Sequence, residues 1–66
     1  MLKLDVDKIK AEMAKRDLTV IDMSDRLGVT SAWIYDIFKR RPVTQADMFA
    51  DDLMIDPKDL IVNDND

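Results

Sequence analysis

The chain has 66 residues, a formal net charge of −4 at pH 7, one glycine, two prolines, no cysteine and no histidine. A single domain of this size buries only a small core, and without Cys it has no disulfide or thiolate site. The lack of Cys and His also excludes a serine triad, a cysteine–histidine pair and zinc sites built from those residues, and one Gly does not make a glycine-rich phosphate loop.

The composition also bears on compartment and activity. No apolar run is longer than four residues, so we expect neither a signal peptide nor a membrane span. A chain without Cys suits a reducing cytoplasm. Only carboxylates and lysines remain as catalytic groups, so we expect no enzyme activity, no cofactor and no small-molecule substrate. Asp47, Asp51 and Asp52 lack the EF-hand order of acids around a glycine, which predicts a solvated helix face and no metal site.

Charge is unevenly distributed along the chain. Residues 1–41 hold nine Lys and Arg against seven Asp and Glu, or +2, whereas residues 42–66 hold one Lys against seven Asp, or −6. The basic part ends in Lys39, Arg40 and Arg41. An acidic chain matches DNA poorly as a whole, because phosphate neutralisation supplies most non-specific affinity. One basic edge can still serve as a contact.

Helical spacing dominates the sequence, and no strand is predicted. A first helix is predicted at about 5–16, with Asp5 or Asp7 at its start and Glu12 among the residues that face water. A second helix is predicted at about 20–27 after Thr19, and Gly28 ends it because the residue after a helix often needs a left-handed conformation.

The rest of the chain is also predicted to be helical. Thr30 caps a third helix at about 31–39, Pro42 stops it, and Thr44 caps a fourth helix. Asp56 and Pro57 start a fifth, and the tail 63–66 is expected to be disordered. The predicted fold is all-α, with five short helices forming one domain over residues 1–62.

Residues 20–39 carry a recognisable spacing. Two short helices are joined by Leu27-Gly28-Val29-Thr30, with the small Ser24 four residues before the glycine and aliphatic residues six and nine after it. The glycine permits the turn, the small residue lets the helices cross closely, and the aliphatic residues hold the second helix so that its outer face projects. This is the helix-turn-helix pattern.

The stretch 18-LTVIDMSDRLGVTSAWIYDIFKRRP-42 resembles the Cro and repressor class of phage and bacterial regulators, and 44-TQADMFADDLMIDPKDLI-61 resembles the fourth and fifth helices of that family. The resemblance covers about residues 5–61. It implies a λ-repressor-like fold and a transcriptional regulator of a phage-type or bacterial genetic switch, working in the bacterial cytoplasm. It also implies that the third helix docks on operator DNA, with two chains bound as a homodimer to half-sites one helical turn apart.

The resemblance places the contacts at the start and on the outer face of the third helix. Ser31 can hydrogen-bond a base or phosphate, Ala32 can touch a thymine methyl group, and Asp36 can accept from a cytosine amino group. Trp33 either contacts the partner or packs at the edge of the core. The cations at 39–41 either bind phosphate or stabilise the end of the helix. The other contact residues expected here are Thr30, Tyr35, Lys39, Arg40 and Arg41.

A protein target is the alternative. Where the family often has Gln, at the start of the second helix, this chain has Val20, and Asp36 would face a polyanion. Apolar and aromatic surface of the kind found at protein interfaces would come from Val20, Ile21, Ala32 and Tyr35, with Phe38 as a further candidate. An antirepressor of this fold would bind a partner repressor and block its DNA binding, and an acidic chain would complement the repressor's basic surface.

Overall fold

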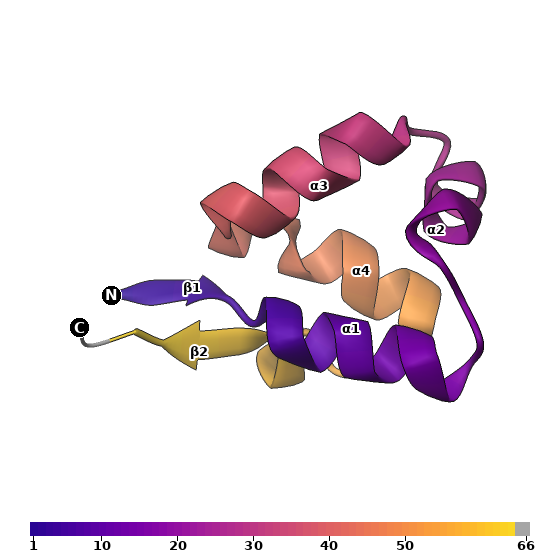
Figure 1. Cartoon of the computed structure of the whole chain (residues 1–66). Helices are drawn as coiled ribbons and strands as arrows, with labels where there is room; N and C mark the ends of the chain where they lie inside the picture. The colour runs from indigo at the N-terminus through magenta and orange to yellow at the C-terminus, as the bar shows by residue number, and fades with distance from the viewer. Residues whose placement is uncertain (65–66) are drawn as a thin grey trace.

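The computed structural model describes residues 1–64, which form a predominantly helical domain with a small two-stranded sheet. Figure 1 shows α3 crossing above α1 and α4, with β1 and β2 side by side at one end of the molecule. In chain order the elements are β1 (Leu2–Leu4), α1 (Val6–Lys15), α2 (Val20–Leu27), α3 (Ser31–Arg40), η1 (Val43–Gln45), α4 (Ala46–Leu53), η2 (Pro57–Leu60) and β2 (Ile61–Asn63).

The first three helices are confirmed to within one residue of their predicted limits. Each begins where a side chain accepts a hydrogen bond from the backbone N–H three residues on, as an N-cap does. Asp5 makes this bond at 3.0 Å and Thr30 at 3.1 Å. Thr19 and Asp22 form a reciprocal capping box, and the hydrogen bond from the Thr19 backbone N–H lowers the pKa of the Asp22 carboxyl group. Local capping chemistry therefore sets where these helices start.

The C-terminal part departs from the predicted all-α, five-helix fold. Asp56 and Pro57 do start a helical turn, but η2 is a 3-10 turn of four residues that ends at Leu60. The chain then enters β2, which pairs antiparallel with β1 and places Ile61 opposite Leu4. The prediction of a fifth α-helix is therefore wrong, and the sheet is absent from the prediction. Residues 2–7, LKLDVD, do alternate apolar and polar side chains as a strand does, and the prediction overlooks this signal for β1, whereas the three residues of β2 show no such alternation.

Two further local expectations change. Thr44 does not cap a helix: it lies inside η1, and α4 follows Gln45 without a side-chain cap. In the segment 63–66, Asn63 ends β2, and the Asp64 N–H donates to the Met1 carbonyl at 2.9 Å. Residues 65–66 lie outside the described part of the chain. The sheet thus brings the end of the described chain back to its beginning.

One core joins the helices to the sheet. Leu4 of β1 and Leu60 of η2 are fully buried together with residues from all four α-helices. Phe38, a candidate for contact with a partner, is instead buried, with only 9% of its surface exposed, and its ring centroid lies 5.9 Å from that of Phe49. This aromatic pair fixes the C-terminal half of α3 against α4. The largest fully buried side chains are Phe49, Leu4, Ile9, Met23, Ile34, Ile37, Leu53 and Leu60.

Glu12 is buried rather than facing water as expected, with 5% of its surface exposed. Its carboxylate lies 2.8 Å from Arg16 Nη1, 2.9 Å from Lys15 Nζ and 3.1 Å from Lys8 Nζ. These three cations, Arg16 foremost, lower the pKa of Glu12 from 4.5 to about 2. Arg16 Nη2 also donates to the Leu53 carbonyl at 2.7 Å, at the C-terminal end of α4. Glu12 and Arg16 therefore tie α1 to α4.

Candidate contact surface on the third helix

The turn between α2 and α3 is set by Gly28, which has φ 70° and ψ 33°. A Cβ at this position would meet no atom within 4 Å, so the requirement for glycine is conformational and not steric. The Val29 N–H donates to the Ser24 carbonyl at 3.0 Å and closes the end of α2. The chain then leaves α2 in a new direction, and Thr30 starts α3.

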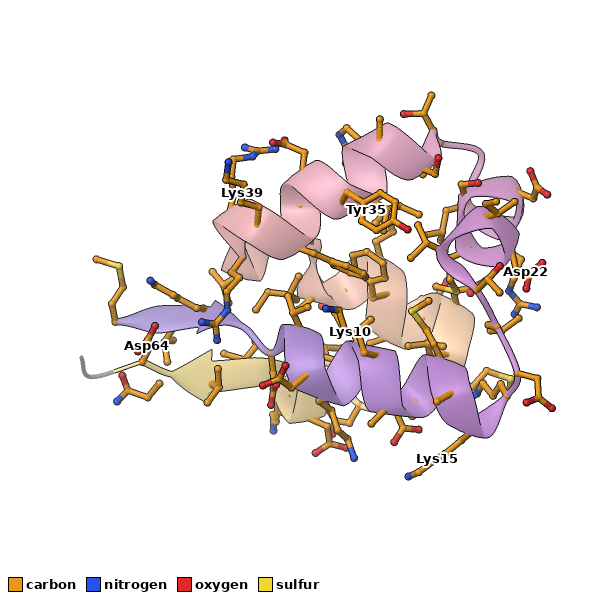
Figure 2. The ribbon with its side chains drawn as sticks, in the orientation of Figure 1. Lys10, Lys15, Asp22, Tyr35, Lys39 and Asp64 are labelled. Carbon is orange, nitrogen blue, oxygen red and sulfur yellow. The ribbon has the colours of Figure 1, made fainter. Side chains whose placement is uncertain are left out.

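Burial divides α3 into two faces. Ile34, Ile37 and Phe38 form its buried stripe, with at most 9% of each side chain exposed. The opposite side is exposed to solvent, and Tyr35 retains 61% of its accessible surface. Figure 2 shows Tyr35 and Lys39 along α3. We call the exposed set the α3 face, which comprises Thr30, Ala32, Tyr35, Asp36, Lys39 and Arg40.

Two expected contact residues of α3 lie at the flanks of this face. Ser31 and Trp33 are half-buried, and Trp33 packs against the core. The Trp33 backbone N–H is held by the Thr30 hydroxyl. Of the two interpretations of Trp33, edge-of-core packing is therefore the one its position fits. Fewer residues of α3 are therefore exposed than were expected to contact a partner.

The charges of the α3 face are partly compensated. Arg40 Nη2 lies 2.7 Å from Asp36 Oδ2, and Arg40 Nε donates to the same oxygen at 2.8 Å. Both side chains are more than half exposed, so this pair adds little stability. It nevertheless sets one carboxylate beside one guanidinium on the surface. The side chain of Lys39 makes no hydrogen bond or ion pair with residues 1–64, so it is the uncompensated cation of the face.

Arg41 has a different position from the one expected of a phosphate contact. It caps α3 in a left-handed conformation with φ 55°, and its N–H donates to the Ile37 carbonyl. Its Nε donates to the Leu4 carbonyl at 3.1 Å, while the Leu4 N–H donates back to the Arg41 carbonyl at the same distance. Nη1 lies 3.5 Å from Asp64. Arg41 therefore joins the end of α3 to the sheet.

The two expected contact residues of α2 also differ from each other. Val20 is half-buried and packs against the core, so little of it is available to a partner. Ile21 is 66% exposed, which is unusual for an isoleucine at the start of a helix. Ile21 of α2 and Tyr35 of α3 are the large apolar side chains of these two helices that are exposed to solvent.

Contact between Lys10 and α3 was not expected. Lys10 Nζ lies 5.8 Å from the centroid of the Phe38 ring, so α1 contributes a cation beside α3 (Figure 2). The sequence carries no local signal for this contact, because residues 10 and 38 meet only through the packing of α1 and α3.

No family model, curated protein or solved structure matches the chain. Within residues 1–64, no helix is long and apolar enough to cross a membrane. Among the same residues 1–64, no three acidic side chains are arranged to hold a metal ion.

Proposed function

We propose that this chain is a helix-turn-helix regulator of transcription in a phage-type or bacterial switch, and that its α3 face docks on operator DNA. The observation that carries the proposal is the sharp break at Gly28 between α2 and α3, followed by a helix with one buried stripe and one fully projecting side. A helix presented in this way can enter the major groove while the rest of the domain stays outside it.

The distribution of charge supports this orientation. Residues 30–41 carry three cations against Asp36, or +2, whereas residues 43–60 carry Lys58 against five aspartates, or −4. A chain polarised in this way would approach a polyanion with α3 leading and the acidic part turned away. Two copies are expected on one operator, because a single short helix reads only a few base pairs.

Salt dependence and one substitution test the proposal. The affinity of the full chain for operator DNA should fall steeply as salt rises, because phosphate contacts release counterions. Lys39→Ala should weaken binding to all sequences alike and make the salt dependence shallower. Lys58→Ala, which removes an exposed lysine from η2, is the matched control and should leave DNA binding unchanged. Equal effects of both changes would contradict docking through α3.

The surface chemistry of α3 favours a second candidate, an antirepressor that binds a repressor protein and blocks its DNA binding. Tyr35 and Ile21 expose large apolar surfaces, which is typical of protein interfaces. Asp36 compensates Arg40 and would repel phosphate, but it would attract a basic partner surface.

Asp36→Asn separates the two candidates because it moves them in opposite directions. If α3 docks on DNA, removing the carboxylate leaves Arg40 free for phosphate, and affinity should rise by about twofold to fivefold at low salt. If α3 docks on a basic protein surface, the same change should weaken that complex. Asp7→Asn, at an exposed position on α1, makes the same charge change away from α3 and serves as control.

A further inference from the structure

A second surface, separate from the α3 face, is formed where α4 meets η2. An open groove of about 510 Å³ is lined by Asp47, Met48, Asp51, Ile55 and Pro57. Met48, Ile55 and Pro57 are half-buried and form its apolar part. Asp47 and Asp51 are exposed, so two carboxylates border an apolar surface.

The two groove carboxylates are not compensated within the protein. Asp52, the third acid of α4, lies 2.9 Å from Arg26 Nε, but Asp47 and Asp51 make no ion pair or side-chain hydrogen bond with residues 1–64. They lie four residues apart on one helix, where like charges repel each other. Asp51 also lies near the C-terminal end of α4, where a negative charge is unfavourable. Asp47 lies in the first turn of α4, where a negative charge is favourable, so Asp51 is the carboxylate that a cationic partner would compensate most.

We infer that this groove docks a basic amphipathic segment of another protein, a helix with Lys or Arg side chains one turn apart beside apolar residues. Asp47 and Asp51 are themselves one helical turn apart, so they complement two cations with that spacing. Met48, Ile55 and Pro57 receive the apolar side chains. This inference does not depend on what the α3 face binds.

A second copy of this chain supplies the required cations poorly. Lys3, Lys8, Lys15 and all four arginines lie beside carboxylates within the domain. Lys10 lies over the Phe38 ring, which leaves Lys39 and Lys58 as exposed lysines without a carboxylate or aromatic partner in residues 1–64. These two belong to different elements, α3 and η2, and so do not form a pair one turn apart.

The experiment uses the full chain and a labelled helical peptide with two lysines one turn apart beside two leucines. Binding is measured by fluorescence anisotropy at low ionic strength, and the contact is mapped by backbone amide NMR. We expect the peptide to perturb Met48, Asp51 and Ile55, and a peptide with glutamates in place of the lysines not to bind. The double variant Asp47→Asn and Asp51→Asn should weaken binding by about fivefold.

Matched variants keep the test specific. The double variant Asp7→Asn and Asp25→Asn removes the same charge from exposed positions on α1 and α2 and should leave peptide binding unchanged. Lys39→Ala tests the α3 face and should have no effect either, so failure of the groove and failure of the proposed DNA contact are distinguishable. Absence of binding, equal weakening by both double variants, or NMR changes confined to α3 would overturn the inference. Self-association abolished by the groove variant would overturn it too, because the occupant would then be a second copy.

Discussion

At the scale of single residues, buried Glu12 shows how a charged side chain comes to hold two helices together. Its carboxylate forms ion pairs with Lys8, Lys15 and Arg16. Arg16 in turn donates a hydrogen bond to the last carbonyl of α4. Removing one partner from such a group leaves the others without compensation, which costs more than the loss of an exposed ion pair.

Glu12 should make the stability of the domain sensitive to acid. Its pKa is lowered from 4.5 to about 2 in the folded protein, so the unfolded chain takes up the proton more readily. The stability that Glu12 contributes is therefore complete above about pH 5 and is lost as the pH falls towards about 2. In urea unfolding at several pH values, Glu12→Gln should be less stable than the native chain at neutral pH, and the gap should close in this window. A gap that stays constant would contradict the ion cluster.

Gly28 is the residue whose backbone conformation matters most for the candidate site. At φ 70° an L side chain is strained even though space is available, so Gly28→Ala should reduce the free energy of unfolding by about 1 to 2 kcal/mol. Gly28→Asn should lose less, because Asn tolerates the left-handed region. Thermal or urea unfolding measures both changes. Equal stability of the alanine variant and the native chain would show that the turn does not need this conformation.

At the scale of elements, α3 is defined by the contrast between its two faces. Ile37→Ala empties a position that is 1% exposed and should cost about 2 to 5 kcal/mol of stability. Tyr35→Ala, two residues away, should change stability by no more than about 0.5 kcal/mol, because the side chain is 61% exposed. Urea unfolding of both variants tests the orientation of α3. A large loss from Tyr35→Ala would place the tyrosine in the core.

The two-stranded sheet offers a second contrast of the same kind. Leu4 is fully buried and Leu2 is 58% exposed, although both lie in β1. Leu4→Ala should cost about 2 to 5 kcal/mol, whereas Leu2→Ala should have little effect. Similar losses from the two changes, measured by urea unfolding, would contradict the observed facing of the strand.

Elements differ in how far the sequence predicts them. The first three helices have side-chain caps and apolar residues at helical spacing, so their limits follow from local chemistry. The sheet depends on pairing between residues 2 and 63, and no local pattern reports a partner so distant. The fifth predicted helix shares its start, Asp56 and Pro57, with the 3-10 turn that forms instead. An N-cap thus predicts where a helical turn begins but not how long it lasts.

In the candidate site, too, some features follow from the local sequence and others depend on long-range packing. Exposure of Tyr35 and Asp36 is expected from their positions opposite the buried stripe, and the structure bears it out. The position of Arg41 could not be predicted, because it bonds to Leu4, which is distant in the sequence. Burial of Phe38 likewise depends on Phe49 of α4. Long-range packing decides which of the expected contact residues remain available.

At the scale of the whole molecule, net charge alone is misleading. The chain carries −4 overall, but the part around α3 is positive and the part around α4 and η2 is negative. We propose a different kind of partner for each part, a polyanion for the α3 face and a basic segment for the groove beside α4. If both proposals hold, the chain binds its target and a second protein through separate surfaces.

We propose that the α3 face is the contact surface for operator DNA, and selection of duplexes from a randomised pool by the purified full chain, at low ionic strength, tests this proposal. We expect enrichment of one sequence whose affinity falls steeply with salt and is weakened in folded Tyr35→Ala and Lys39→Ala variants. A pool with no enriched sequence, or an enriched duplex that both variants bind as tightly as the native chain does, would contradict it.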